Sequence, residues 1–128
     1  MPRTHIVLVV DDDRDVRAYY ADALEQAGHL VWQATNGADA FGRLQGGEVP
    51  CVVLADVRMP KMDGWDLSRA AGRDPQLASV PIVLVTADRL LSYTSPVLDK
   101  PMSPDELDAL VERSCRLHRS SELGADEA

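Results

Sequence analysis

Five short apolar runs divide this chain, and each is followed by a polar residue or a turn. The runs cover residues 5–10, 30–35, 51–56, 81–86 and about 96–99. Apolar runs of this length without polar alternation are typical of strands buried on both faces of a parallel sheet. Segments with helical spacing of apolar residues separate most of them, and parallel strands need such crossover connections. The pattern therefore predicts an α/β fold, and 128 residues suffice for one domain.

Helix boundaries are marked most clearly at the end of the first helix and at the start of the last one. Gly28 follows the first helical segment, where glycine is a typical C-terminal stop. Before the last helix, Ser103 is the expected N-cap, Pro104 takes the first helical position and Glu106 completes a capping box. Apolar residues at helical spacing then predict that this helix extends to about His118.

Chain length and charge limit the organisation of the protein and its partners. We expect residues 1–119 to form the domain and residues 120–128 to form a short, acidic, flexible tail. No apolar stretch approaches the roughly 20 residues of a membrane-spanning helix. No secretory signal fits before the first strand, so a cytoplasmic protein without a membrane partner is expected. The net charge of −8 argues against nucleic acid as a partner, since phosphates would repel it.

Polar side chains stand where the predicted strands end. Asp11 and Asp12 follow the first strand, and Asp56 ends the third. Thr86 ends the fourth, and Lys100 follows the fifth. In an open α/β sheet, ligands bind outside the carboxyl ends of the strands. Three carboxylates, a hydroxyl and an ammonium at one edge predict a site for a divalent cation and a phosphoryl group.

The connection between the fourth and fifth strands is too short for a complete crossover helix. Nine residues separate Thr86 from Pro96, whereas a parallel crossover with its helix needs at least about 10–12. We therefore expect a largely irregular link, with the fourth helix missing or vestigial.

Four motifs resemble the receiver domain of response regulators in bacterial two-component signalling. They are Val-Val-Asp-Asp-Asp at 9–13, Asp-Val-Arg-Met-Pro-Lys-Met-Asp-Gly at 56–64, Val-Thr-Ala at 85–87 and Lys-Pro at 100–101. The motifs occur in order, each at a strand end, and the resemblance covers residues 5 to about 118. It implies a doubly wound, flavodoxin-like, five-stranded parallel sheet with strand order 2-1-3-4-5, and a switch driven by aspartyl phosphate.

The resemblance also assigns a role to each acidic residue of the predicted site. Asp56 matches the phosphoacceptor, and Asp11 and Asp12 match the acidic pair that binds Mg²⁺ together with it. The backbone carbonyl of Arg58 would complete the protein ligands. The alternative is that acids after strands merely cap helices, as we expect Asp13 to do for the helix that follows it.

Further positions of the family motifs match residues near the expected phosphate. Thr86 would move its hydroxyl toward the phosphoryl group, and Lys100 would contact that group as a mobile charge. The alternatives are an ordinary strand-end residue and a surface lysine. Gly64 is expected to permit a backbone conformation that other residues resist. Arg58 and Asp88 carry opposite charges, and a salt bridge between them across the mouth of the site would affect dephosphorylation. The alternative is two solvated side chains.

One departure from the family concerns the output of the switch. Val97 stands where the family usually has an aromatic residue, and valine has no ring to swing inward. The usual coupling between the threonine and that ring is therefore in doubt. The departure favours, as one alternative, an interaction module that works without phosphorylation.

Two other residue types receive ordinary structural explanations. His5, His29 and His118 are scattered at element edges and are expected to be structural or solvated. Cys51 and Cys115 lack metal-ligand spacing and are expected to be plain core or helix residues.

The expected function is that of a stand-alone, single-domain response regulator. It would accept a phosphoryl group on Asp56, with Mg²⁺, from a histidine kinase or histidine phosphotransfer protein. It would signal by contact with an unidentified protein target, and it would not be an enzyme beyond its own phosphorylation and dephosphorylation. The alternatives are a phosphorylation-independent, receiver-like interaction module and a phosphate sink for a kinase.

Overall fold

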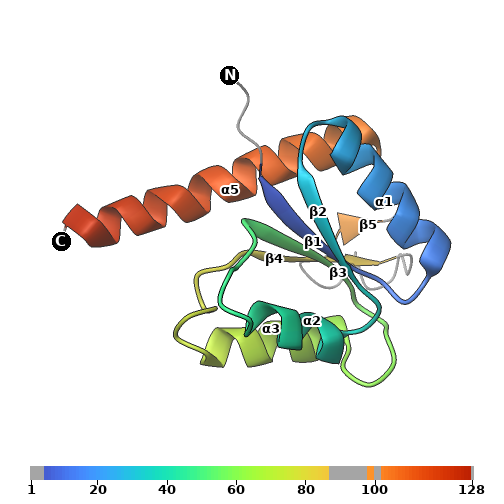
Figure 1. Cartoon of the computed structure of the whole chain (residues 1–128), viewed down its shortest axis with the longest axis horizontal. Coiled ribbons are helices and arrows are strands. Elements are labelled where there is room, and N and C mark those ends of the chain that lie inside the picture. Colours follow the sequence, from blue (N-terminus) through green and yellow to red (C-terminus); the bar gives the residue numbers. More distant parts are fainter. Residues whose placement is uncertain (1–4, 87–97, 100–101, 128) are drawn as a thin grey trace.

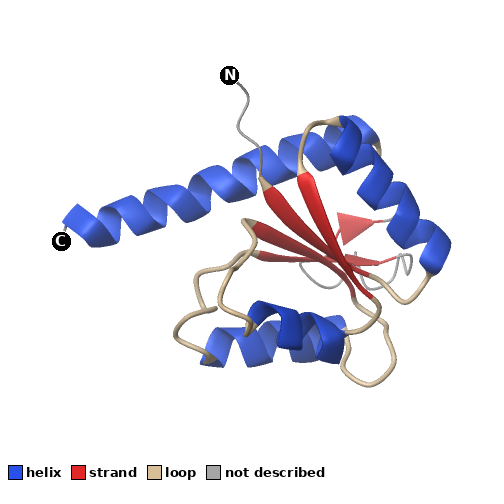
Figure 2. Cartoon of the chain, in the orientation of Figure 1, coloured by secondary structure: helices blue, strands red, loops and turns tan. Residues whose placement is uncertain are grey.

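The computed structural model describes residues 5–86, 98–99 and 102–127. The elements in chain order are β1 (Ile6–Val10), α1 (Arg14–Gln26), β2 (Leu30–Ala34), α2 (Gly37–Leu44), β3 (Val52–Asp56), α3 (Gly64–Arg73), β4 (Ile82–Thr86), β5 (Leu98–Asp99) and α5 (Pro104–Glu127). They form three layers, in which the sheet separates α1 and α5 from α2 and α3 (Figures 1 and 2).

The sheet is parallel throughout, with strand order β2-β1-β3-β4-β5. The predicted α/β class and the order of the first four strands, which is that of a flavodoxin-like fold, are confirmed. The described part of β5 comprises two residues, which pair with the end of β4. The prediction of a missing or vestigial fourth helix falls on residues 87–97, which lie outside the described residues.

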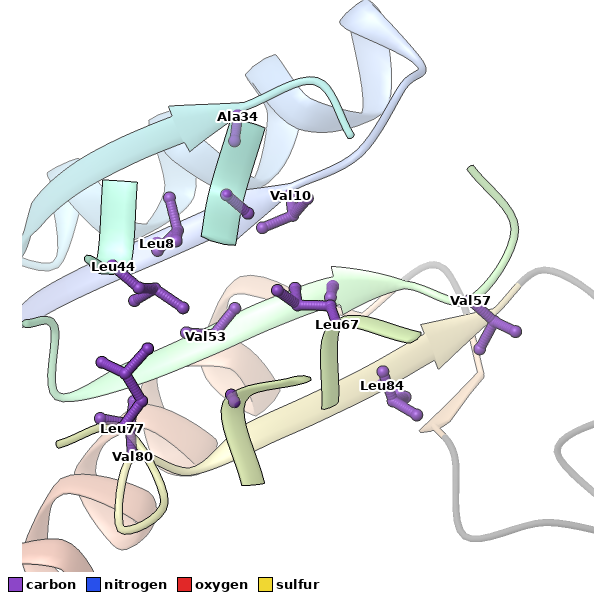
Figure 3. Packing of buried hydrophobic residues seen from close by; sticks show 13 residues of the cluster. Leu8, Val10, Ala34, Leu44, Val53, Val57, Leu67, Leu77, Val80 and Leu84 are labelled. Carbon is purple, nitrogen blue, oxygen red and sulfur yellow. The ribbon is translucent and has the colours of Figure 1, made fainter. Parts of the chain in front are cut away.

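Two apolar clusters cover the two faces of the sheet. Successive side chains of a strand point to opposite faces, so Leu8 and Val10 belong to one cluster and Val7 and Val9 to the other. The first cluster packs against α2 and α3 and includes Leu44 and other residues shown in Figure 3. The second packs against α1 and α5. Both faces are therefore buried, which explains why the strands are continuous apolar runs.

The helix termini follow the predicted signals with one exception. Gly28 has a φ of +97°, as expected for a glycine beyond a helix end. The Ser103 hydroxyl accepts the backbone N–H of Glu106 at 3.2 Å, so the predicted N-cap of α5 is confirmed. The prediction that α5 ends near His118 is wrong, because the helix continues to Glu127 and projects beyond the sheet (Figure 1). The division into a domain and a flexible tail stays a prediction.

None of the described helices is both long and apolar enough to cross a membrane.

Candidate functional site

Sheet register brings the carboxyl ends of three strands together. Val10 of β1 pairs with Ala55 of β3, so the residues that follow them, Asp11 and Asp56, are level with each other. Asp56 in turn pairs with Val85 of β4, which places Thr86 one position further along the same edge. The strand ends thus bring together Asp11, Asp56 and Thr86, as the alternation of strands and helices predicts.

The centre of the candidate site is a group of three carboxylates. One oxygen each from Asp11, Asp12 and Asp56 lies within 4.8 Å of the other two. Asp11 is buried, Asp56 is half-buried and Asp12 is exposed, so the group opens to solvent on one side. Carboxylates this close repel one another, and oxygen ligands of this kind suit a hard divalent cation such as Mg²⁺. The donor set therefore fits the metal that the family motif implies.

A local hydrogen bond orients the buried member of this group. The backbone N–H of Asp13 donates to Oδ1 of Asp11 at 2.9 Å. Asp13 is also the N-cap of α1, where its own carboxylate accepts the backbone N–H groups of Asp15 and Val16. The capping role expected for Asp13 is confirmed, and it is separate from the position of Asp11 in the carboxylate group.

Arg17 supports the end of β1 in a way that the sequence analysis missed. Its Nη1 donates to the backbone carbonyl of Asp11 at 2.7 Å, and its Nε donates to Oε1 of Gln33 at 3.2 Å. The guanidinium therefore ties the first turn of α1 to the ends of β1 and β2. The sequence signal is weak, since one arginine in a first helical turn resembles any solvated residue.

The loop between β3 and α3 is fixed by a close approach of backbone to backbone. A Cβ on Gly64 would lie 2.5 Å from the carbonyl oxygen of Asp56 and 2.9 Å from Cδ2 of Leu84. Gly64 is not among the positive-φ residues, so the expectation that it supplies an unusual backbone conformation is wrong. Gly64 is needed because any side chain at this position would collide with the Asp56 carbonyl oxygen. The left-handed conformation in this loop belongs to Lys61, with a φ of 69°.

The remaining predicted residues have different outcomes. Thr86 is buried at the end of β4, and Arg58 is exposed in the loop that follows β3. Their roles, and that of the Arg58 carbonyl as a metal ligand, stay predictions. Lys100, Asp88 and Val97 lie outside the described residues.

Two tyrosines of α1 fix the segment that follows β5. Tyr19 donates its hydroxyl to the carbonyl of Met102 at 3.0 Å, and the N–H of Met102 donates to the Tyr20 hydroxyl at 3.4 Å. Met102 is two residues beyond Lys100 in the sequence. These contacts connect α1 with Met102, one residue before the N-cap of α5.

Comparison with known proteins gives consistent results. The model of the response regulator receiver domain matches residues 7–112. Response regulator Rre1 of Synechocystis is 34% identical over 95% of this chain, which spans 57% of that protein. Response regulator receiver protein CpdR of Brucella abortus is 37% identical over 84% of this chain and 93% of its own. The structure of chemotaxis response regulator CheY4 of Vibrio cholerae matches with a TM-score of 0.74 at 26% identity, over 88% of this chain and 99% of the other.

Proposed function

The chain belongs to the response regulator receiver family, and from this membership we propose that Asp56 accepts a phosphoryl group from a histidine kinase or histidine phosphotransfer protein. The phosphorylated form signals by contact with a downstream protein. The reactions that it catalyses are its own phosphorylation and dephosphorylation. The net charge of −8 supports a protein target rather than nucleic acid.

The observation that carries this proposal is the carboxylate group at the sheet edge. Three carboxylates whose oxygens lie within 4.8 Å are costly to hold together unless a cation neutralises them. Asp11, Asp12 and Asp56, with the backbone carbonyl of Arg58, would hold Mg²⁺. When bound, this ion would neutralise part of the negative charge on the transferring phosphoryl group.

Asp56 acts as the nucleophile of the transfer. One of its carboxylate oxygens forms a bond to phosphorus, while the bond from phosphorus to the donor nitrogen or oxygen breaks and its electron pair leaves with the donor. Asp56 is half-buried, so part of the residue is exposed to solvent. Hydrolysis of the acyl phosphate by water then returns the carboxylate and inorganic phosphate.

Thr86 and Lys100 complete the proposed site. Thr86 is buried beside the end of β3, where its hydroxyl would donate a hydrogen bond to a phosphoryl oxygen. Lys100 would supply a positive charge to the same group.

Calorimetric titration with Mg²⁺ tests the metal site. The unmodified protein should bind one ion, and Asp12→Asn, which removes one ligand charge, should weaken binding by about tenfold or more. Asp22→Asn is the matched control, because it makes the same charge change at an exposed position of α1. Equal loss of affinity in both variants would indicate general electrostatics and contradict the proposed ligand set.

A phosphorylation-independent interaction module is the second candidate function. The observation that favours it is Val97, where the family usually has an aromatic residue. In such a module the target would bind equally well to the unmodified protein and to the protein with beryllofluoride at Asp56. The complete set of three carboxylates, threonine and lysine favours the phosphorylation-dependent function.

A further inference from the structure

A second cluster of potential metal ligands lies at the opposite end of the sheet from the three carboxylates. His5 directly precedes β1, Cys51 directly precedes β3, and Cys115 projects from α5. The backbone N–H of Cys51 donates to the carbonyl of Ile6 at 2.8 Å, which fixes the two strand starts side by side. His5 and Cys51 are 46 positions apart in the sequence, and Cys51 and Cys115 are 64 positions apart, yet the three side chains lie together.

The three potential ligand atoms lie close together, and the separation of one pair matches tetrahedral zinc geometry. The sulfur atoms of both cysteines and one ring nitrogen of His5 all lie within 4.8 Å of one another. Cys51 Sγ is 3.7 Å from His5 Nδ1. Zinc bonds of about 2.3 Å to sulfur and about 2.05 Å to nitrogen, at tetrahedral angles, place those two atoms about 3.6 Å apart. The observed separation thus needs almost no adjustment on metal binding.

A carboxylate orients the histidine of this cluster. Oε2 of Glu112 lies 3.4 Å from Nε2 of His5, on the ring edge away from Cys51. A proton on Nε2 leaves Nδ1 with its lone pair directed to the cysteine side. Metal-bound histidines are commonly held in this way by a carboxylate at the second ring nitrogen.

A second buried histidine lies beside His5 and has an unpaired ring nitrogen. The His29 ring lies 5.4 Å from the His5 ring, centroid to centroid, and its Nε2 is 2.9 Å from Oδ1 of Asp108. Its Nδ1 is buried and has no hydrogen-bond partner among the described residues. Buried polar atoms in native proteins are nearly always paired, and an orphan often indicates an ion or water.

We propose that His5, Cys51 and Cys115 form a second metal site, and that this site binds Zn²⁺. Thiolate and imidazole ligands prefer zinc to magnesium, so the two ends of the sheet select different ions. Three protein ligands leave a fourth position for a solvent ligand, and half-buried Cys51 gives access from outside.

Metal binding at this site would displace the protons of both cysteines. Burial raises the pKa of the Cys115 thiol, and the neighbouring Cys51 and Glu112 raise it further, which opposes the loss of its proton. Zinc binding replaces the thiol protons, and both protons leave to solvent as the two Zn–S bonds form.

Occupancy of this site would connect three elements that are far apart in sequence. His5 and Cys51 lie at the starts of neighbouring strands, and Cys115 lies on the helix that covers them. A metal that joins all three binds the folded chain more tightly than the unfolded one, because folding holds the three ligands together. It should therefore raise the melting temperature of the protein.

Cobalt(II) is the probe that tests the proposal, because thiolate ligands give it a charge-transfer band in the near ultraviolet. The chain has two cysteines, and the carboxylate site has no sulfur, so any such band must come from Cys51 or Cys115. The protein, reduced with a phosphine, should bind one equivalent with this band, and one equivalent of Zn²⁺ should remove it. Absence of the band would overturn the proposal.

Variants separate ligands from the residue that orients one of them. Cys51→Ser and His5→Gln should each weaken Co²⁺ binding at this site by more than about 100-fold, whereas Glu112→Gln should weaken it by about tenfold and keep the band. Asp12→Asn, in the carboxylate group, is the control and should leave the band unchanged. If Cys115→Ser fails to fold, Cys51→Ser at the half-buried position still decides the result. Unchanged binding in folded Cys51→Ser and His5→Gln would overturn the proposal.

Discussion

At the scale of single residues, the position of Asp56 depends on the absence of one side chain. Gly64 has no Cβ, and this lets the start of α3 approach the Asp56 carbonyl more closely than any other residue would permit. Gly64→Ala should therefore displace Asp56, the proposed phosphoacceptor, and lower the free energy of unfolding by about 1–3 kcal/mol. Urea denaturation measures the second effect, and the rate of phosphorylation by a small-molecule donor measures the first.

The matched control for this variant lies in the same helix. A Cβ on Gly72 would meet no atom within 4 Å. Gly72 lies in the last turn of α3, so Gly72→Ala should leave the stability unchanged or raise it by up to about 0.5–1 kcal/mol, since alanine has a higher helix propensity than glycine. If Gly64→Ala is as stable as Gly72→Ala and is phosphorylated at the normal rate, then the close approach has no functional importance.

The position of a site residue can be predicted from the sequence where a polar residue of suitable chemistry directly follows or ends a predicted strand. The location of Asp11, Asp12 and Asp56 at one edge is predictable, because parallel strands bring their carboxyl ends together. The structural role of Gly64 is not predictable, because the sequence shows where a glycine lies but not which atoms pack against it. The cluster of His5 with two cysteines escapes detection for a similar reason, because its members have no characteristic spacing.

At the scale of elements, the start of α5 is fixed by its N-cap. The Ser103 hydroxyl accepts the N–H of Glu106 and donates to the carboxylate of that residue, each at 3.2 Å. Ser103→Ala should lower the free energy of unfolding by about 1 kcal/mol, and Ser103→Asp, which keeps an acceptor, should retain most of the stability. Equal losses in both variants, measured by urea denaturation, would show that the cap contributes little.

The two ends of α5 show what local sequence can predict about an element. The start has a serine, a proline and a glutamate in positions with known preferences, and it is predicted to the residue. Beyond His118 the sequence is polar and includes Gly124, which costs a helix about 1 kcal/mol relative to alanine. That composition favours an end to the helix. No proline stops it, however, and the helix runs on to Glu127.

At the scale of the whole molecule, stability rests on the two clusters that cover the sheet. Leu67 of α3 is completely buried in one of them, whereas Leu30 at the start of β2 is 57% exposed. Leu67→Ala should lower the free energy of unfolding by about 2–5 kcal/mol, because it removes packed methyl groups and leaves a cavity. Leu30→Ala should cost less than about 1 kcal/mol. Similar costs for both in urea denaturation would contradict this account of the core.

The fold as a whole is more predictable than its details. Buried apolar strands that alternate with helical segments leave few arrangements other than a doubly wound parallel sheet. Strand order, by contrast, follows from the family resemblance and not from periodicity. The same strand, β3, ends at Asp56 and begins next to Cys51, so one element connects the carboxylate site with the proposed zinc site.

Intact-mass spectrometry determines directly whether Asp56 accepts a phosphoryl group. The protein is incubated with Mg²⁺ and acetyl phosphate, alongside Asp56→Ala and, as a control for an unrelated acid, Asp22→Ala. We expect one added phosphoryl group in the unmodified protein and in Asp22→Ala, and none in Asp56→Ala or when Mg²⁺ is removed by a chelator. An unmodified protein that gains no phosphoryl group and also fails to bind beryllofluoride would contradict phosphorylation at Asp56, as would an adduct that persists in Asp56→Ala.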